Sequence, residues 1–354
     1  MTAAWLLYGA NGYTGELIAR RAVAEGERPV LAGRSAVSVG NLAAELGLDH
    51  RVFALDDAGA VDRGLAGMTA VLHCAGPFSR TAAPMAEACL RARLHYLDIT
   101  GEIEVFEGMA ARHEAARRAG VTLLPGVGFD VVPSDGLAAH LQRRLPSATH
   151  LALGFQGSGR LSRGTATTMV ENLHRGGAVR RDGRIVPVPA AWKTRVIDFG
   201  AGPTAAITIP WGDVATAYHT TGIPNTEVYM AAPRTMRLVL KLARPLAPLL
   251  ATGLVQARLK RRIQAGPPGP SPAHRARARS RLWGEARDAS QVVVSRLETL
   301  EGYELTSRTA LLAVQRVAAG GVATGFQTPG RAFGPDFILA VEPTSRRDDP
   351  PRPV

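Results

Sequence analysis

Cysteine is scarce in this chain, and its two cysteines form no pattern that binds a metal or builds a disulfide framework. Cys74 and Cys89 stand apart without a C-x-x-C pair, and the nine histidines are scattered without a His-Glu-x-x-His helix. Protein metal sites typically show such clusters at short spacing. We therefore predict no metal site and two buried thiols.

Long uninterrupted apolar runs are also missing. The N-terminus has no basic segment followed by an apolar core, because Leu6 to Tyr8 runs straight into a glycine turn. Residues 234–263 are apolar but carry Arg237, Lys241, Arg244 and two prolines, whereas a membrane span needs ~20 predominantly apolar residues. We predict a cytoplasmic protein in which 234–263 covers the core or forms a dimer, or else makes a peripheral membrane contact.

Acidic residues are too few to balance the basic ones. The chain has 42 Lys and Arg against 30 Asp and Glu, a net charge of +12, which favours an anionic partner. Aromatic residues make up only 5% and are not interleaved with the basic ones, so we exclude nucleic acid as the partner. With 354 residues and 46% hydrophobic content, two globular domains are expected.

A glycine turn between a buried strand and a helix is the first feature that carries chemistry. The segment Trp5 to Ala19 has the spacing G-x-x-G-x-x-G. Such a turn lets the backbone approach a pyrophosphate, which then binds at the helix N-terminus. The predicted cofactor-binding residues are Gly9, Asn11, Gly12, Tyr13, Thr14 and Gly15.

The end of the second predicted strand indicates which dinucleotide is bound. The apolar run Pro29 to Ala32 is followed by Gly33-Arg34-Ser35, without a nearby carboxylate. An acidic residue here holds the 2'-hydroxyl of NAD, whereas arginine accommodates the 2'-phosphate of NADP. We predict that Arg34 and Ser35 bind NADP(H), the alternative for Arg34 being an ordinary solvated side chain.

Strand-like and helix-like stretches alternate regularly through the first 135 residues. This pattern predicts an α/β fold, a Rossmann-type doubly wound parallel sheet. We expect this domain to include residues 1–135 and a return at about 304–343. A second α+β domain on a mixed sheet should cover 136–303, followed by a disordered, proline-rich tail at 344–354.

Ligands of doubly wound sheets lie beyond the carboxyl ends of the strands. Three further loops fall there, and from them we predict cofactor contacts by Ala75, Gly76, Pro77, Phe78, Thr100, Gly101 and Gly128. The nicotinamide ring should end near the last two of these loops. A proton donor is then needed beside it, and the candidates are Glu102, Asp130, Asp135 and Tyr96. Each carboxylate could equally cap a helix or brace a loop, and Tyr96 could pack in the core.

Several of these motifs together resemble the saccharopine dehydrogenase-like oxidoreductases. They are Tyr8 to Gly15, Ala32-Gly33-Arg34, Ala75 to Phe78, Tyr96 to Glu102 and Gly128 to Asp135, with later pieces at Ser162 to Ala166, Trp283 to Arg287 and Gly325 to Pro329. Within that family the chain is similar to bacterial members related to trans-acting enoyl reductases. The resemblance implies an NADP-dependent enzyme whose second domain holds the substrate, an imine or an enoyl chain.

Charge in the second domain bears on the substrate class. From His140 to Lys260 there are sixteen Lys and Arg against five carboxylates. The ammonium group of an amino-acid substrate is normally bound by carboxylates. A cationic domain is better suited to a phosphopantetheine thioester on CoA or on an acidic acyl carrier protein. We expect NADPH-dependent reduction of a C=C bond in an apolar acyl substrate. The alternatives are imine reduction on an amino-acid substrate and a non-catalytic NADP-binding protein at a lipid surface. Homodimerisation is a further expectation.

Overall fold

The structure, a computed structural model, describes residues 4–157, 160–172, 176–233, 235 and 252–354. The chain forms two compact units. The first consists of Met1–Val132 and Tyr303–Phe333, and the second of Pro133–Gly302 and Gly334–Val354. None of the described helices is long and apolar enough to cross a bilayer.

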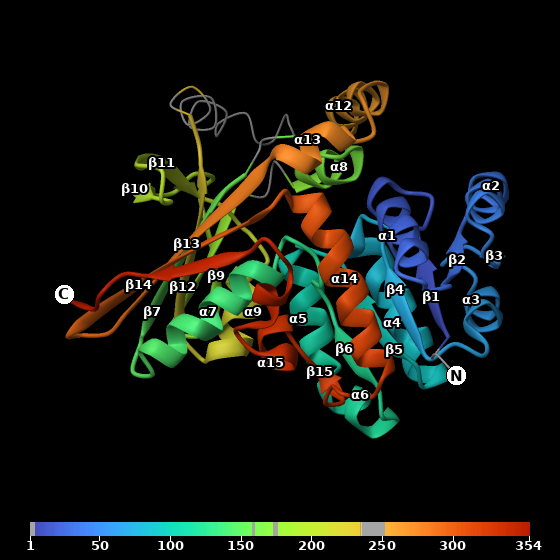
Figure 1. The fold of residues 1–354 in the computed structure, drawn as a ribbon, viewed down its shortest axis with the longest axis horizontal. Helices are drawn as coiled ribbons and strands as arrows, with labels where there is room; N and C mark the ends of the chain where they lie inside the picture. Colours follow the sequence, from blue (N-terminus) through green and yellow to red (C-terminus); the bar gives the residue numbers. More distant parts are fainter. Residues whose placement is uncertain (1–3, 158–159, 173–175, 234, 236–251) are drawn as a thin grey trace. The chain divides into compact units, whose positions relative to one another are not determined.

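The first unit is built on a seven-stranded parallel sheet (Figure 1), which confirms the predicted doubly wound fold. Its strands are β1 (Trp5–Tyr8), β2 (Val30–Gly33), β3 (His50–Val52), β4 (Ala70–His73), β5 (His95–Asp98), β6 (Thr122–Leu124) and β15 (Gly325–Phe326). They run in the order β15-β6-β5-β4-β1-β2-β3. The order reverses between β1 and β4, and ligands of such sheets bind beyond the strand ends at this point.

Helices connect the strands and cover the sheet. They are α1 (Tyr13–Ala24), α2 (Ala36–Leu46), α3 (Ala58–Leu65), α4 (Phe78–Ala92), α5 (Ile103–Ala111), α6 (His113–Ala119), α14 (Gly302–Ala318) and α15 (Pro329–Phe333). One apolar cluster joins side chains of α3, α4, α5 and α6 to the sheet. Helix α14 lies beside α1, where Arg21 pairs with Glu304 at 2.5 Å.

An unusual polar residue lies in this core. His73, the last residue of β4, is fully buried and packs against the rings of Tyr8, Phe78 and Tyr96. Neither of its ring nitrogens has a hydrogen-bond partner in the part of the chain that the structure describes. Burial lowers the pKa of His73 to about 3, because the charged imidazolium is disfavoured away from water. The imidazole is therefore neutral in the folded protein.

We predict that His73 makes the protein sensitive to acid. The unfolded chain protonates this residue near pH ~6.5 and the folded chain does not, so stability falls as pH drops below that value, by up to about 1.4 kcal/mol per pH unit. His73→Phe should flatten this slope in urea denaturation followed across the pH range. His50→Phe, at an exposed position on β3, is the control. An unchanged pH slope in His73→Phe would contradict the assignment.

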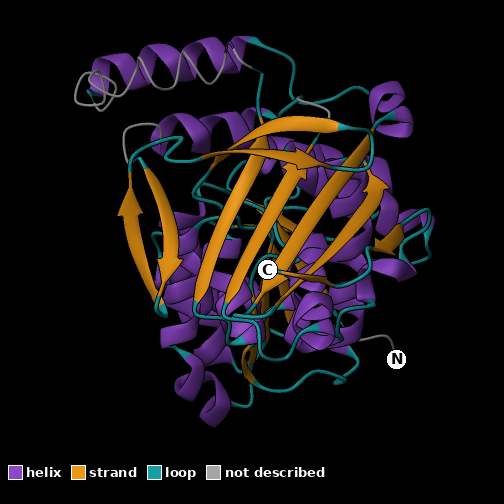
Figure 2. Ribbon diagram, turned by 90° about the vertical axis from the view of Figure 1, so that its left-hand side faces the viewer, coloured by secondary structure: helices purple, strands orange, loops and turns teal. Residues whose placement is uncertain are grey.

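The second unit is built on a mixed sheet, which Figure 2 shows face on. Its strands are β7 (His150–Gln156), β8 (Gly177–Arg181), β9 (Arg184–Val188), β10 (Thr194–Asp198), β11 (Pro203–Thr208), β12 (Asn225–Ala231), β13 (Arg279–Arg287), β14 (Gln291–Leu300), β16 (Ser345–Asp348) and β17 (Arg352–Pro353). The main order is β10-β11-β12-β7-β13-β14-β16, with β12 and β7 parallel and the other neighbours antiparallel. The α+β mixed-sheet prediction is confirmed.

Helix α7 packs against the middle of this sheet. The other helical segments are α8 (Arg163–Asn172), α9 (Asp213–Thr221), α12 (Gly253–Ala265), α13 (Pro272–Arg277) and a 3-10 turn, η2 (Phe337–Ala340). Helix α7 covers Val132–Arg144, and a β-carbon on Gly284 of β13 would lie 2.6 Å from the Leu141 side chain. The missing side chain at Gly284 therefore lets α7 lie close to the strand.

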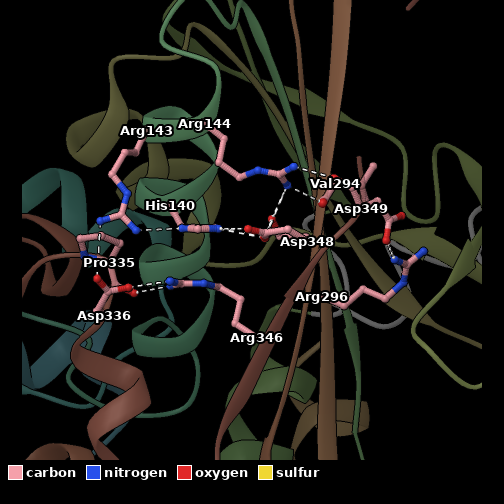
Figure 3. Close-up of polar contacts among 11 residues, drawn as sticks. His140, Arg143, Arg144, Val294, Arg296, Pro335, Asp336, Arg346, Asp348 and Asp349 are labelled. Atoms are coloured by element: carbon pink, nitrogen blue, oxygen red, sulfur yellow. Dashed lines mark hydrogen bonds and ion pairs between the residues drawn. The ribbon is translucent and has the colours of Figure 1, made fainter. Parts of the chain in front are cut away.

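The predicted disorder of residues 344–354 is wrong. Strand β16 pairs with β14, and Figure 3 shows the polar contacts that hold it. Arg346 binds Asp336 at 2.6 Å, and Asp348 accepts hydrogen bonds from His140 of α7 and from the Ser295 hydroxyl. The polar composition that suggested disorder instead supplies these contacts. Residues 234 and 236–251, most of the segment predicted to reach a membrane or partner, lie outside the described residues.

Candidate cofactor site

The predicted glycine turn forms a tight link between β1 and α1. Gly9 has φ +80°, and a β-carbon there would lie 2.7 Å from the backbone nitrogen of Ala75. A β-carbon on Gly15 would collide with the carbonyl of Gly9. Gly12 is the N-cap of α1 and has no side chain with which to cap the helix. The cradle therefore fits a pyrophosphate, which would meet backbone amides and the positive end of the helix dipole.

Two other predicted cofactor residues follow β2, next to this turn. A β-carbon on Gly33 would lie 2.9 Å from the Asn11 side-chain oxygen, so the two loops touch. Arg34 is exposed, and Ser35 caps α2 by accepting the Ser38 N–H at 3.2 Å. Burial raises the pKa of Tyr8 to about 12, and nearby Arg34 partly opposes the rise. Arg34 directly precedes Ser35, the N-cap of α2, and a phosphate would be held at this helix N-terminus.

The loop after β4 is held by Glu102. Its two carboxylate oxygens accept the backbone N–H groups of Phe78 at 2.8 Å and Ser79 at 2.9 Å. These groups lie in the first turn of α4, which has Pro77 as its N-cap. The Thr81 hydroxyl donates to the carbonyls of Ala75 and Pro77. Glu102 therefore caps a helix, which is the alternative role that the sequence analysis gave for it.

Asp98 is a site residue that the sequence reasoning missed. It is fully buried at the end of β5, and its carboxylate accepts hydrogen bonds from the Tyr96 hydroxyl at 2.6 Å and the Thr100 and Gly126 amides. Burial raises the pKa of Asp98 to about 6 despite these donors. Asp98 thereby joins the loops after β5 and β6. A carboxylate at Asp98, within the apolar strand motif Tyr96 to Ile99, could have indicated this role, because buried carboxylates are rare without a partner.

Asp130 lies where these two loops meet. A β-carbon on Gly101 would lie 2.9 Å from an oxygen of the Asp130 carboxyl, so the carboxyl packs closely against the loop after β5. Burial raises the pKa of Asp130 to about 7. The carboxyl group is therefore partly protonated near neutral pH, which suits a proton donor.

Helix α14 supports this loop from the other end of the chain. The Phe129 N–H donates to the Thr306 hydroxyl at 2.9 Å, and the Thr309 hydroxyl donates to the Val127 carbonyl at 2.8 Å. In the same helix, the Tyr303 ring meets the ring of Tyr13 edge to face with centroids 5.1 Å apart. The sequence analysis predicted that the chain returns to this domain at about 304–343, but no local pattern showed that Tyr303 and Thr306 would reach the site.

The four catalytic candidates therefore lie in different surroundings. Tyr96 is fully buried and its hydroxyl is bonded to Asp98, which matches the core-packing alternative. Asp135 belongs to α7 in the second unit, where it is buried and accepts the Thr220 hydroxyl at 2.6 Å. The structure brings Glu102 and Asp130 to the strand-end loops of the first unit. Of these two, the Glu102 carboxylate is occupied by the backbone of α4.

Comparison with known proteins places this site in a family context. Residues 5–124 match the family described as the saccharopine dehydrogenase NADP binding domain. The trans-acting enoyl reductase of Mycobacterium leprae (strain TN) is 35% identical over 148 residues, 40% of this chain. That of Mycobacterium tuberculosis (strain ATCC 25618 / H37Rv) is 32% identical over 147 residues, 39% of this chain. Each match spans only 35% of the relative's length.

A solved structure extends the likeness in fold to nearly the whole chain. Apo saccharopine dehydrogenase (L-Glu forming) from Saccharomyces cerevisiae superposes with a TM-score of 0.66, covering 98% of this chain and 100% of that one. Sequence identity is 10%, so this likeness concerns the fold alone.

We predict that Arg34→Gln weakens NADPH binding and leaves NADH binding nearly unchanged. Only the 2'-phosphate distinguishes the two cofactors, and a charge-assisted hydrogen bond contributes about 1.5–3 kcal/mol, or roughly tenfold to a hundredfold in Kd. Isothermal titration calorimetry measures both dissociation constants. Arg63→Gln, at an exposed position on α3, is the control. Equal losses for the two cofactors, or no loss for either, would contradict this role of Arg34.

Proposed function

We propose that the protein is an NADPH-dependent reductase of a C=C bond in an apolar acyl substrate, starting from the match of residues 5–124 to the family described as the saccharopine dehydrogenase NADP binding domain. The cofactor is NADP(H). The reaction, the substrate and the proton donor are our proposals.

The carboxyl of Asp130 is the observation that carries the proposal. Reduction of a conjugated C=C bond needs a hydride at one carbon and a proton at the other. Asp130 lies at the carboxyl edge of the parallel sheet, against Gly101, with its pKa raised by burial to about 7. A side chain in this state holds a proton near neutral pH and can release it to a nearby carbanion or enolate.

The other residues of the site would bind and orient the cofactor. NADPH supplies the hydride when it is bound. The turn Gly9 to Gly15 would hold the pyrophosphate, and Arg34 with the N-terminus of α2 would hold the 2'-phosphate. The loops at Ala75 to Phe78 and Thr100 to Gly101 would line the path of the cofactor, and Gly128 with the first turn of α14 would support Asp130.

Two observations support an acyl thioester as substrate. The relatives that match the N-terminal region are named trans-acting enoyl reductases. In addition, the segment from His140 to Lys260 has sixteen Lys and Arg against five carboxylates. A phosphopantetheine arm on CoA or an acidic acyl carrier protein is anionic, so it suits this charge. A cationic amino-acid substrate of an imine reductase does not.

We predict that the enzyme oxidises NADPH in the presence of an enoyl-CoA thioester and that kcat/KM falls with rising pH above about 7. The protonated fraction of Asp130 decreases tenfold per pH unit there. Asp130→Asn should reduce kcat/KM at neutral pH by about a hundredfold or more and remove this pH dependence. The measurement is NADPH absorbance across a pH series.

Glu104→Gln is the matched control, because Glu104 is an exposed carboxylate on α5 in the same unit. Unchanged NADPH affinity in Asp130→Asn would separate a proton-transfer defect from lost cofactor binding. An Asp130→Asn enzyme with the wild-type pH profile would remove Asp130 from the mechanism. Turnover of an amine with an oxoacid, and none with enoyl thioesters, would replace the C=C proposal by imine reduction.

A further inference from the structure

Three helices of the second unit form a layer in which no helical residue is fully buried. This basic helical layer consists of α8, α12 and α13 with their flanking residues, and it is visible in Figure 1. Polar contacts join two of these helices. Lys260 of α12 pairs with Glu171 of α8 at 2.5 Å, and the side-chain amide of Gln256 donates to the Val170 carbonyl at 2.9 Å. A surface helix of a globular protein normally buries an apolar stripe, so this layer is unusual.

The charge of the layer has almost one sign. Residues 160–172 and 253–279 contain nine Lys and Arg and a single carboxylate. That carboxylate, Glu171, is already paired with Lys260. Arg258, Arg261 and Arg262 are exposed on α12, and the structure gives them no ion pair with any described residue. This face therefore presents an uncompensated positive potential to an approaching partner.

Large apolar side chains project from the same layer. Leu254 is 87% exposed, Met169 47% and Leu161 46%. The other strongly exposed hydrophobic residues among those described are all valines, at scattered positions. Exposed leucine and methionine next to arginines are typical of helices that lie in a membrane interface, where the aliphatic chain enters the acyl region and the cations meet the headgroups.

We propose that the basic helical layer docks the protein on an anionic lipid bilayer, with Leu254 and Met169 entering the interface and Arg258, Arg261 and Arg262 contacting lipid phosphates. Lipid headgroups are mobile and adapt to scattered cations. Each Lys or Arg near such a surface adds to the electrostatic attraction. An acidic protein would instead need a packed apolar centre, and the exposed apolar residues of this layer are single projecting side chains. The proposal goes beyond the reductase activity and does not depend on it.

The test is co-sedimentation of the full-length protein with vesicles. Wild type should bind vesicles of phosphatidylcholine mixed with phosphatidylglycerol, bind pure phosphatidylcholine at least tenfold more weakly, and dissociate at high salt. Arg258→Gln/Arg261→Gln/Arg262→Gln should lose binding to the anionic vesicles. Leu254→Ser/Met169→Ser should weaken binding severalfold even at low salt, because the apolar part of the contact is removed.

Two controls keep the result specific. Arg63→Gln/Arg118→Gln/Arg184→Gln removes the same charge at other exposed positions and should bind vesicles like wild type. NADPH affinity, measured by calorimetry, should be unchanged in every variant, which verifies folding and separates this test from that of the reductase. The proposal is overturned if the wild-type protein does not bind anionic vesicles, whether or not it binds an acidic carrier protein. A triple variant of α12 that binds vesicles as tightly as the control also overturns it.

Discussion

The close contact between Gly15 and the Gly9 carbonyl is the constraint on which the site depends. With any side chain at Gly15, α1 could not start directly behind β1. Because α1 does start there, its N-terminus lies at the reversal of strand order, and its N-cap, Gly12, has no side chain with which to cap the helix. The same turn touches the end of β4 through Gly9 and the end of β2 through Asn11. One tight turn thereby brings three strand ends together, where we propose that the cofactor binds.

Burying two carboxyl groups at the ends of β5 and β6 lowers the stability of the fold. Asp98 and Asp130 are carboxyl groups with pKa values raised by burial, so folding disfavours their ionised forms. Asp98 is compensated by three hydrogen-bond donors that join the loops after β5 and β6. Asp130 gains support through its neighbour Phe129, whose amide donates to Thr306 of α14. Perturbed groups of this kind cluster at functional sites, and here they lie beside the proposed path of the cofactor.

The sequence predicts the first unit well because its signals are local. Apolar runs, glycine turns and helical stretches alternate in chain order, and parallel strands with crossovers bring their ends together. Asp98, Tyr303 and Thr306 were missed because their roles depend on contacts with distant segments. The tail was misjudged for the same reason, since its polar residues bind α7 and β14. The composition of a segment shows that its side chains are polar. It does not show whether they bind water or a distant segment of the same chain.

We propose above all that the turn Gly9 to Gly15, Arg34 and the loops after β4, β5 and β6 form one NADP(H) site. Hydrogen–deuterium exchange of the full-length protein with and without NADPH tests it most directly. Amides at 9–15, 34–38, 75–79, 99–102 and 126–130 should gain protection together as NADPH is added, and NADH should protect 34–38 less. Protection confined to the second unit, or at only one of these loops, would contradict the claim.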